Sequence, residues 1–164
     1  MKAIKEIMAT SPISCGKNET IKTVVGHMSK SNIGFLPVID ENKKVIGTIT
    51  DRDVCLAISK ASKPMNELKV MDVMNKKAHL IKQDEDVHAA LKMMRTHQVG
   101  RLPVVDNENH LKGIVSLTRI VRKAKESSEK AEIEYSGKEN VINTLSAIAE
   151  RNKKKQNIEE AAEE

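Results

Sequence analysis

Aromatic side chains are almost absent from this 164-residue chain, which has one Phe, one Tyr and no Trp. Its core must therefore consist of Ile, Val, Leu, Ala and eight Met residues, and Met-containing cores repack readily. Proteins that bind single-stranded nucleic acids commonly stack bases on aromatic rings. Because the chain lacks such rings and any recognition-helix signature, we do not expect it to bind nucleic acid.

Cysteine and long apolar runs are also scarce. Cys15 and Cys55 are the only cysteines, and they form no C-x-x-C motif, so we expect neither a disulfide framework nor a zinc site. No apolar run approaches the ~20 residues of a membrane span, and nothing resembles a signal peptide. We expect a reduced, cytoplasmic protein without membrane contact.

Catalytic and metal-binding motifs are missing as well. The sequence has no G-x-x-x-x-G-K-[ST], G-x-S-x-G or H-E-x-x-H. His88 and His97 are nine residues apart, which places them on opposite faces of a helix, and the other three His residues have no partner at ligand spacing. We therefore predict no enzyme activity, no metal site and no required cofactor.

Charge is unevenly distributed along the chain. Residues 124–164 hold 7 Lys or Arg and 10 Glu, a net charge of −3, whereas residues 1–123 have a net charge of +8. A basic body suits an anionic ligand, although net charge alone identifies none.

One stretch of the sequence is repeated. "IGFLPVIDENKKVIGTITDRDV" (33–54) returns 66 residues later as "VGRLPVVDNENHLKGIVSLTRI" (99–120), and the alignment extends without gaps over 8–54 and 74–120. Two copies are too few for a solenoid. The repeat therefore predicts a pseudo-symmetric pair that shares one core.

Each copy predicts the same order of elements. Apolar residues spaced i, i+3, i+4, i+7 indicate an amphipathic helix, first at Ile21, Val24, Val25 and Met28, then at Val87, Ala90, Leu91 and Met94. Two strands follow, joined by an Asp-rich turn, and a second helix begins after Thr50 or Ser116. With a short strand near 13–15 or 79–81, each repeat becomes an α/β unit (α+β type) with a small three-stranded sheet. Single glycines at 47 and 113 indicate close approach by another segment.

These motifs carry a family resemblance. "LPVID" with "GTITDRD", and "LPVVD" with "GIVSLTR", resemble a tandem pair of cystathionine-β-synthase (CBS) domains, a regulatory module that often binds adenosine-containing ligands. The resemblance covers residues ~4–124. It implies a disc-like pseudodimer with two clefts between the repeats, and further association into a homodimer. We assign the first repeat to 1–66, the second to 67–124, and a charged linker with a C-terminal helix to 125–164.

The pair Thr50 and Asp53 allows two interpretations. In the family, G-x-x-T/S-x-x-D places a hydroxyl and a carboxylate in the cleft, and this resemblance implies that Asp53 accepts hydrogen bonds from ribose hydroxyls. Thr-x-x-Asp also resembles a capping box, which would stabilise the helix and bind nothing. The two roles are compatible for Thr50.

The resemblance extends the site to further residues. Arg101 would reach the phosphate from the other repeat, or else form a surface salt bridge. The base would lie against backbone near 11–15 and 34–37. The expected ligand-binding residues are Thr50, Asp53, Arg101, Ser11, Pro12, Ile13, Gly34, Phe35 and Pro37.

The second cleft departs from the family pattern. Arg119 stands where the first repeat has Asp53, and a guanidinium donates hydrogen bonds but accepts none. This cleft is therefore empty or holds an anion. Its expected residues are Ser116, Arg119, His79, Gly100 and Pro103.

The charged tail holds one more amphipathic pattern. Val141, Leu145, Ile148 and Ala149 form a stripe at helical spacing. A lone helix of this length is marginal in water, so it needs a surface on its own body, on a dimer mate or on a target protein. We predict a helix over ~138–152 whose Val141–Leu145–Ile148 stripe is buried against a dimer mate or a target protein.

Together, these observations predict a module that binds an adenine nucleotide or an S-adenosylmethionine-like molecule and responds by a change in shape or partner affinity. The competing hypothesis is a ligand-free interaction module that uses the C-terminal helix.

Overall fold

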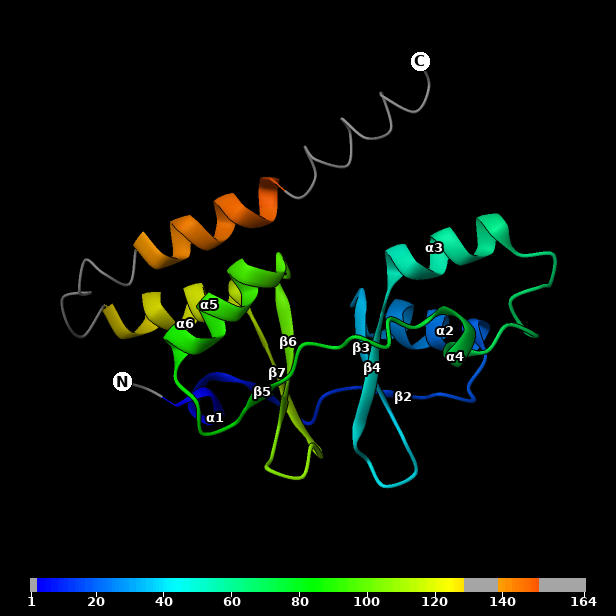
Figure 1. The fold of residues 1–164 in the computed structure, drawn as a ribbon, viewed down its shortest axis with the longest axis horizontal. Coiled ribbons are helices and arrows are strands. Elements are labelled where there is room, and N and C mark those ends of the chain that lie inside the picture. Colours follow the sequence, from blue (N-terminus) through cyan, green and yellow to red (C-terminus); the bar gives the residue numbers. More distant parts are fainter. Residues whose placement is uncertain (1–2, 129–138, 151–164) are drawn as a thin grey trace, which may run out of the picture. The chain divides into compact units, whose positions relative to one another are not determined.

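The computed structural model describes residues 3–128 and 139–150 (Figure 1). Its helices are α1 (Ile4–Ile7), α2 (Ile21–Ser31), α3 (Asp51–Lys60), α4 (Val70–Val73), α5 (Val87–His97), α6 (Leu117–Ser128) and a C-terminal helix over 139–150. Its strands are β1 (Ala9–Thr10), β2 (Cys15–Gly16), β3 (Phe35–Ile39), β4 (Val45–Thr50), β5 (Ile81–Lys82), β6 (Arg101–Val105) and β7 (Leu111–Ser116). In the described ranges no helix has the length and hydropathy of a membrane span.

The chain forms two compact units, each built around one repeat. The first-repeat unit comprises Ser11–Leu80 with the turn Val105–Lys112. Of the described residues, the second-repeat unit comprises 3–10, Ile81–Val104, 113–128 and 139–150. The segment that precedes the first repeat's sheet therefore packs with the second repeat.

The first-repeat unit has the three-stranded sheet that the sequence predicts. β2 pairs parallel with β3, and β3 pairs antiparallel with β4. The apolar stripe of α2 is buried at Ile21, Val24 and Met28, which pack with strand residues in one core. Thr20 begins this helix by accepting a hydrogen bond from the N–H of Thr23 at 3.3 Å.

The second-repeat unit has four strands rather than three, in the order β1-β7-β6-β5. The fourth strand is β1, which pairs antiparallel with β7 through Ala9 opposite Ile114 and Thr10 opposite Gly113. The three-stranded prediction is therefore wrong for this unit. Two residues are too few to show strand periodicity, so the pairing of β1 depends on a partner more than 100 residues away. The buried stripe of α5 (Ala90, Leu91 and Met94) is confirmed.

The two strand glycines are indeed approached closely by other segments. A Cβ built on Gly47 would lie 2.9 Å from the carbonyl oxygen of Asn75, and one built on Gly113 would lie 2.6 Å from that of Ala9. Both values are too short for a real Cβ contact. Each glycine therefore allows a neighbouring backbone segment to pack against its hairpin.

The Asp of each Leu-Pro-Val-x-Asp motif builds the turn that follows. Oδ1 of Asp40 accepts hydrogen bonds from the N–H groups two and four residues later, both at 2.9 Å, and Asp106 repeats this at 3.0 and 2.9 Å. Burial of the Asp106 carboxylate opposes its ionisation, but hydrogen bonds from His110 and Lys112 outweigh that effect and hold its pKa below the usual range. These aspartates thus have a structural role.

The C-terminal helix packs on its own second-repeat unit, alongside α5 (orange in Figure 1). Val141 and Ile148 contact that unit's core, and Thr144 is 1% exposed. Val141 and Ile148 therefore pack on their own unit and not on a dimer mate or a target protein. Leu145 is 51% exposed and Thr144 takes its place in this contact, so burial of Leu145 against a dimer mate or a target protein stays a prediction. The Thr144 hydroxyl donates to the carbonyl of Asn140 at 2.7 Å, which allows its burial. Residues 138, 151 and 152 of the predicted helix lie outside the described residues.

Candidate functional site

One end of the first-repeat sheet gathers most of the predicted ligand-binding residues. Phe35, at the start of β3, lies opposite Thr50, at the end of β4. Because β2 runs parallel to β3, residues 11–13 before β2 lie at the same end as residues 34–37. Three segments that are far apart in sequence therefore converge at this end of the sheet.

Thr50 and Asp53 form a closed capping box at this end of the sheet. Oδ2 of Asp53 accepts hydrogen bonds from the Thr50 N–H at 2.9 Å and from its hydroxyl at 2.6 Å. Thr50 Oγ1 accepts in return from the Asp53 N–H at 3.1 Å. The capping interpretation is thus confirmed. The described residues donate only to Oδ2, and the Asp53 side chain is half-buried, so Oδ1 keeps its acceptor capacity.

Gly34 links the start of β3 to the start of α3. Its carbonyl accepts a hydrogen bond from the N–H of Asp51 at 3.3 Å, and a Cβ at Gly34 would lie 2.3 Å from Oδ2 of Asp51. The second repeat has the same link, from the N–H of Leu117 to the carbonyl of Gly100 at 3.0 Å. Sequence reasoning missed Asp51, although its place directly after the capping Thr was a usable signal.

The other predicted residues at this end differ in exposure. Phe35 and Pro37 are buried within β3, so they contribute to the core and offer mainly backbone. Ser11 is exposed and has a left-handed backbone conformation with φ of 57°. Ile13 is 38% exposed and Pro12 is half-buried. The exposed apolar surface of Ile13 is the type of surface on which a flat base can lie.

Arg101 lies in the second-repeat unit, at the start of β6, and its side chain is exposed. Thr50 and Asp53 lie in the other unit. Contact between Arg101 and a ligand held by those two residues therefore stays a prediction.

The second repeat uses its hydroxyl and its arginine differently. The Ser116 hydroxyl accepts from the N–H of Arg119 at 3.1 Å, which matches the role of Thr50. The Arg119 guanidinium donates through Nε to the carbonyl of Ile7 and through Nη2 to that of Met8 at 3.0 Å. Arg119 thus ties α6 to the end of α1. Among the described residues, these two carbonyls are the partners of the guanidinium.

The remaining second-cleft residues do not all fall in one unit. Gly100 and Pro103 belong to the second-repeat unit, where Pro103 is buried in β6. His79 is half-buried and belongs to the first-repeat unit. Their convergence stays a prediction.

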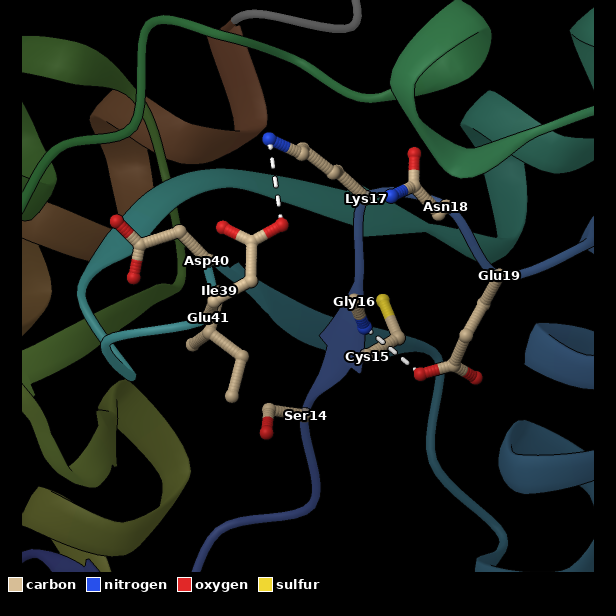
Figure 2. A pocket seen from close by; sticks show the side chains of 9 residues that line it. All are labelled: Ser14, Cys15, Gly16, Lys17, Asn18, Glu19, Ile39, Asp40 and Glu41. Carbon is tan, nitrogen blue, oxygen red and sulfur yellow. Dashed lines mark hydrogen bonds and ion pairs between the residues drawn. The ribbon is translucent and has the colours of Figure 1, made fainter.

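A pocket of about 280 Å³ lies at the opposite end of the first-repeat sheet (Figure 2). Glu19 accepts a hydrogen bond from the Gly16 N–H at 2.7 Å, and Lys17 Nζ lies 3.6 Å from Glu41 Oε1. Burial, with a smaller contribution from Glu19, raises the pKa of the Cys15 thiol to about 12. A thiol that stays protonated is neither a nucleophile nor a metal ligand. Among the described residues, no group of three His, Cys, Asp or Glu is placed to hold a metal ion.

A second hollow, of about 390 Å³, lies between α2 and α3, and we call it the α2–α3 groove. Val25, Met28, Ile33 and Val54 give it an apolar lining, and Asp51 is also among the residues that line it. Sequence reasoning did not find this groove, because helix periodicity predicts buried stripes and not the hollows left between them.

The fold thus consists of two copies of one α/β unit, each with a hydroxyl-capped helix after a two-stranded hairpin. The CBS domain family matches residues 4–60 and 70–126. The chain belongs to this family and contains a CBS pair.

Known proteins with the same module support this assignment. The chain is 36% identical to an inosine-5'-monophosphate dehydrogenase of Methanocaldococcus jannaschii over 125 residues. These aligned residues make up 76% of this chain and 24% of the dehydrogenase. It is 34% identical to the uncharacterized protein YlbB of Bacillus subtilis over 118 residues, 71% of this chain and 78% of YlbB. The chain therefore spans about a quarter of the dehydrogenase's length.

One solved structure adds ligand information. The CBS domain pair of protein MJ0100, in complex with 5'-methylthioadenosine and S-adenosyl-L-methionine, superposes with a TM-score of 0.69 at 27% identity. The match covers 77% of this chain and 98% of that one.

Proposed function

We propose that this chain is a regulatory ligand-sensing module that binds an adenosine-containing molecule, of the AMP, ADP, ATP or S-adenosylmethionine type, through its first repeat. Ligand binding changes the conformation of the pair or its affinity for a partner. The module catalyses no reaction and needs no cofactor, and it acts in the cytoplasm as a homodimer. The adenosine ligands of the MJ0100 CBS pair support this ligand class.

The free acceptor on Asp53 carries the proposal. Oδ2 of Asp53 is used by the capping box, and Oδ1 accepts no hydrogen bond from the described residues. A half-buried carboxylate oxygen at the end of a sheet is a strong acceptor for the two neighbouring hydroxyls of a ribose. The capping box fixes the carboxylate in one orientation, so little side-chain entropy is lost when a ligand binds.

Two other features fit the rest of such a ligand. Residues 11–13 and 34–37 offer backbone groups and the exposed side chain of Ile13 to a base. The N-terminus of α3, directly after Thr50, has backbone N–H groups and a positive dipole end suited to phosphate. Arg101 is the cation that we assign to the same phosphate. The second cleft takes no nucleoside in this proposal, because Arg119 occupies the position of the acceptor.

A second candidate function is a ligand-free interaction module. The closed capping box favours it, because Thr50 and Asp53 then have a complete structural role without a ligand. In that case the C-terminal helix and its surroundings would provide the contact with a target protein.

A thermal-shift screen separates the two functions. AMP, ADP, ATP and S-adenosylmethionine are added to the full chain at increasing concentration, with GMP and inorganic phosphate as controls. The sensor proposal predicts that at least one adenosine compound raises the unfolding temperature in a saturable way while both controls do not. Equal shifts with adenosine compounds and controls, or none with any compound, would contradict it.

A further inference from the structure

The backbone N–H groups at the start of α3 are all engaged by the protein itself. The first four N–H groups of a helix have no partner within its backbone ladder. In α3, the N–H of Thr50 donates to Oδ2 of Asp53 at 2.9 Å, and that of Asp51 donates to the Gly34 carbonyl at 3.3 Å. The N–H of Arg52 donates to Oδ1 of Asp51 at 2.8 Å, and that of Asp53 to Thr50 Oγ1 at 3.1 Å. A phosphate near this helix start would therefore meet the helix dipole but would have to compete with a protein acceptor for each N–H.

Two carboxylates stand at the same helix start. Asp51 and Asp53 lie in the first turn of α3, on either side of Arg52 in the sequence. The other segments at this end of the sheet, 11–13 and 34–37, contain no charged residue. Two aspartates and one arginine give this end a net charge of −1. The helix dipole offsets only about half of that charge. The residues that the first-repeat unit places here therefore repel an anion.

The Asp51 carboxylate lies at the ligand end, although the backbone contacts of the fold do not depend on it. A Cβ at Gly34 would overlap this carboxylate, and Gly34 directly precedes the strand residue that pairs with Thr50. Asp51 is exposed, and its Oδ2 accepts no hydrogen bond from the described residues. In the second repeat, α6 begins with Leu117, whose N–H makes the same link to Gly100 without any carboxylate. A carboxylate at this position also favours the helix dipole, but that role does not distinguish one ligand from another.

We propose that Asp51 makes the first-repeat site select adenosine ligands whose 5′ substituent carries no phosphate and is neutral or positively charged. This inference rests on the proposed function and narrows its ligand class. Adenosine itself and sulfonium compounds such as S-adenosylmethionine are favoured, and AMP, ADP and ATP are increasingly disfavoured. Asp51 acts on the ligand through its charge and not through a hydrogen bond.

Arg101 does not reverse this selection. With Arg101 counted, two arginines face two aspartates, so the side-chain charges at the site sum to zero. The phosphate of AMP adds about two negative charges at neutral pH. Moving that phosphate out of water costs free energy that a site without net positive charge does not offset. A neutral adenosine makes the same ribose contact to Asp53 without this cost.

Adenosine and AMP differ by the phosphate alone, so this pair tests the selection. Both compounds, and S-adenosylmethionine, are titrated calorimetrically into full-length wild-type, Asp51→Asn and Glu41→Gln proteins at low ionic strength. Asp51→Asn removes the charge and keeps the side-chain oxygen that accepts from the Arg52 N–H. Glu41→Gln is the matched control, because Glu41 is an exposed carboxylate at the opposite end of the same sheet.

The wild type should bind adenosine about tenfold more tightly than AMP, and added salt should narrow this difference by screening the repulsion. Asp51→Asn should strengthen AMP binding about fivefold and leave adenosine binding unchanged. Glu41→Gln should alter neither affinity.

Wild-type protein that binds AMP as tightly as adenosine would overturn the selection while leaving the proposed function intact. An affinity ratio that Asp51→Asn leaves unchanged would overturn it as well, because a carboxylate that serves only the helix dipole affects stability and not this ratio. An equal shift in Glu41→Gln would trace the effect to net charge and not to Asp51. If none of the three ligands shows saturable binding to the wild type, the proposed function itself is contradicted, and the selection with it.

Discussion

Thr50 and Asp53 hold each other in place at the start of α3. The hydroxyl of Thr50 donates to Oδ2 of Asp53 at 2.6 Å, while the N–H of Asp53 donates back to that hydroxyl oxygen at 3.1 Å. The two residues thus close a capping box and at the same time fix the direction of the carboxylate. The same pair serves the fold and carries the proposed ligand contact.

The capping role predicts a loss of stability without any ligand. Asp53→Ala should lower the free energy of unfolding of the ligand-free protein by about 1 kcal/mol, because the N–H and the hydroxyl of Thr50 lose their acceptor while the N-cap bond to Thr50 remains. Urea unfolding followed by circular dichroism measures this change. Asp51→Ala is the control: Asp51 is exposed and accepts only from the N–H of Arg52 among the described residues, so its loss should be smaller. Equal losses in the two variants would contradict a specific capping role for Asp53.

The position of Arg119 predicts a structural effect in the second repeat. Arg119→Met removes the donors to the carbonyls of Ile7 and Met8 and should lower the free energy of unfolding by about 1–3 kcal/mol. Arg95→Met, at an exposed position of α5, should change it by less than about 0.5 kcal/mol. If chemical denaturation finds both variants as stable as wild type, the contact of Arg119 with α1 contributes nothing to the fold.

The strand glycines allow a matched comparison. Gly113→Ala should destabilise the protein by about 1–3 kcal/mol, because the added methyl group would overlap the carbonyl oxygen of Ala9. Gly100 has no atom within 4 Å of a built Cβ, and its φ is not positive, so Gly100→Ala should leave stability unchanged or raise it by up to about 1 kcal/mol. Thermal unfolding of the two variants checks the difference. A Gly113→Ala protein with wild-type stability would show that β1 does not pack against β7.

Cys15 and Cys55 should differ in reactivity. Burial raises the pKa of Cys15 to about 12, so at pH 8 the native protein should react with iodoacetamide at Cys55 alone, and at both thiols in denaturant. The protonated Cys15 contributes stability that is fully present below the unfolded thiol pKa of about 8.5 and is lost as pH rises toward 12. Mass spectrometry counts the modified sites, and rapid alkylation of Cys15 in the native protein would contradict its burial.

Periodic burial explains which elements the sequence predicted. Helices α2 and α5 each bury one face against a sheet, so their apolar residues recur at helical spacing and could be read directly. The four-residue helices α1 and α4 are too short to show any period. The pairing of β1 with β7 depends on a contact between distant segments, which a single sequence does not encode locally.

The candidate site could be predicted only in part, because some of its contacts join residues that are far apart in the sequence. The repeat placed Thr50 and Asp53 at the start of a helix, and the capping box confirms the local half of that prediction. From the sequence, Arg119 could be recognised only as the loss of the acceptor that Asp53 provides in the first repeat. Its own hydrogen-bond partners lie 112 and 111 residues away, so the sequence did not predict them. The sequence did not predict burial of Thr144, because a search for apolar stripes omits polar residues. The Thr144 hydroxyl can be buried because it donates a hydrogen bond to the carbonyl of Asn140 in its own helix.

Calorimetric titration of the full chain with AMP, ATP and S-adenosylmethionine tests the central claim most directly, with wild-type and Asp53→Ala proteins compared. We predict saturable binding of at least one of these ligands near one molecule per chain. Asp53→Ala should weaken it by about 1–3 kcal/mol, because the ribose hydroxyls lose their acceptor. Circular dichroism confirms that the variant is folded. Unchanged affinity in folded Asp53→Ala protein would contradict the ribose-binding role of Asp53, and two equal sites per wild-type chain would contradict the assignment of a single nucleoside cleft.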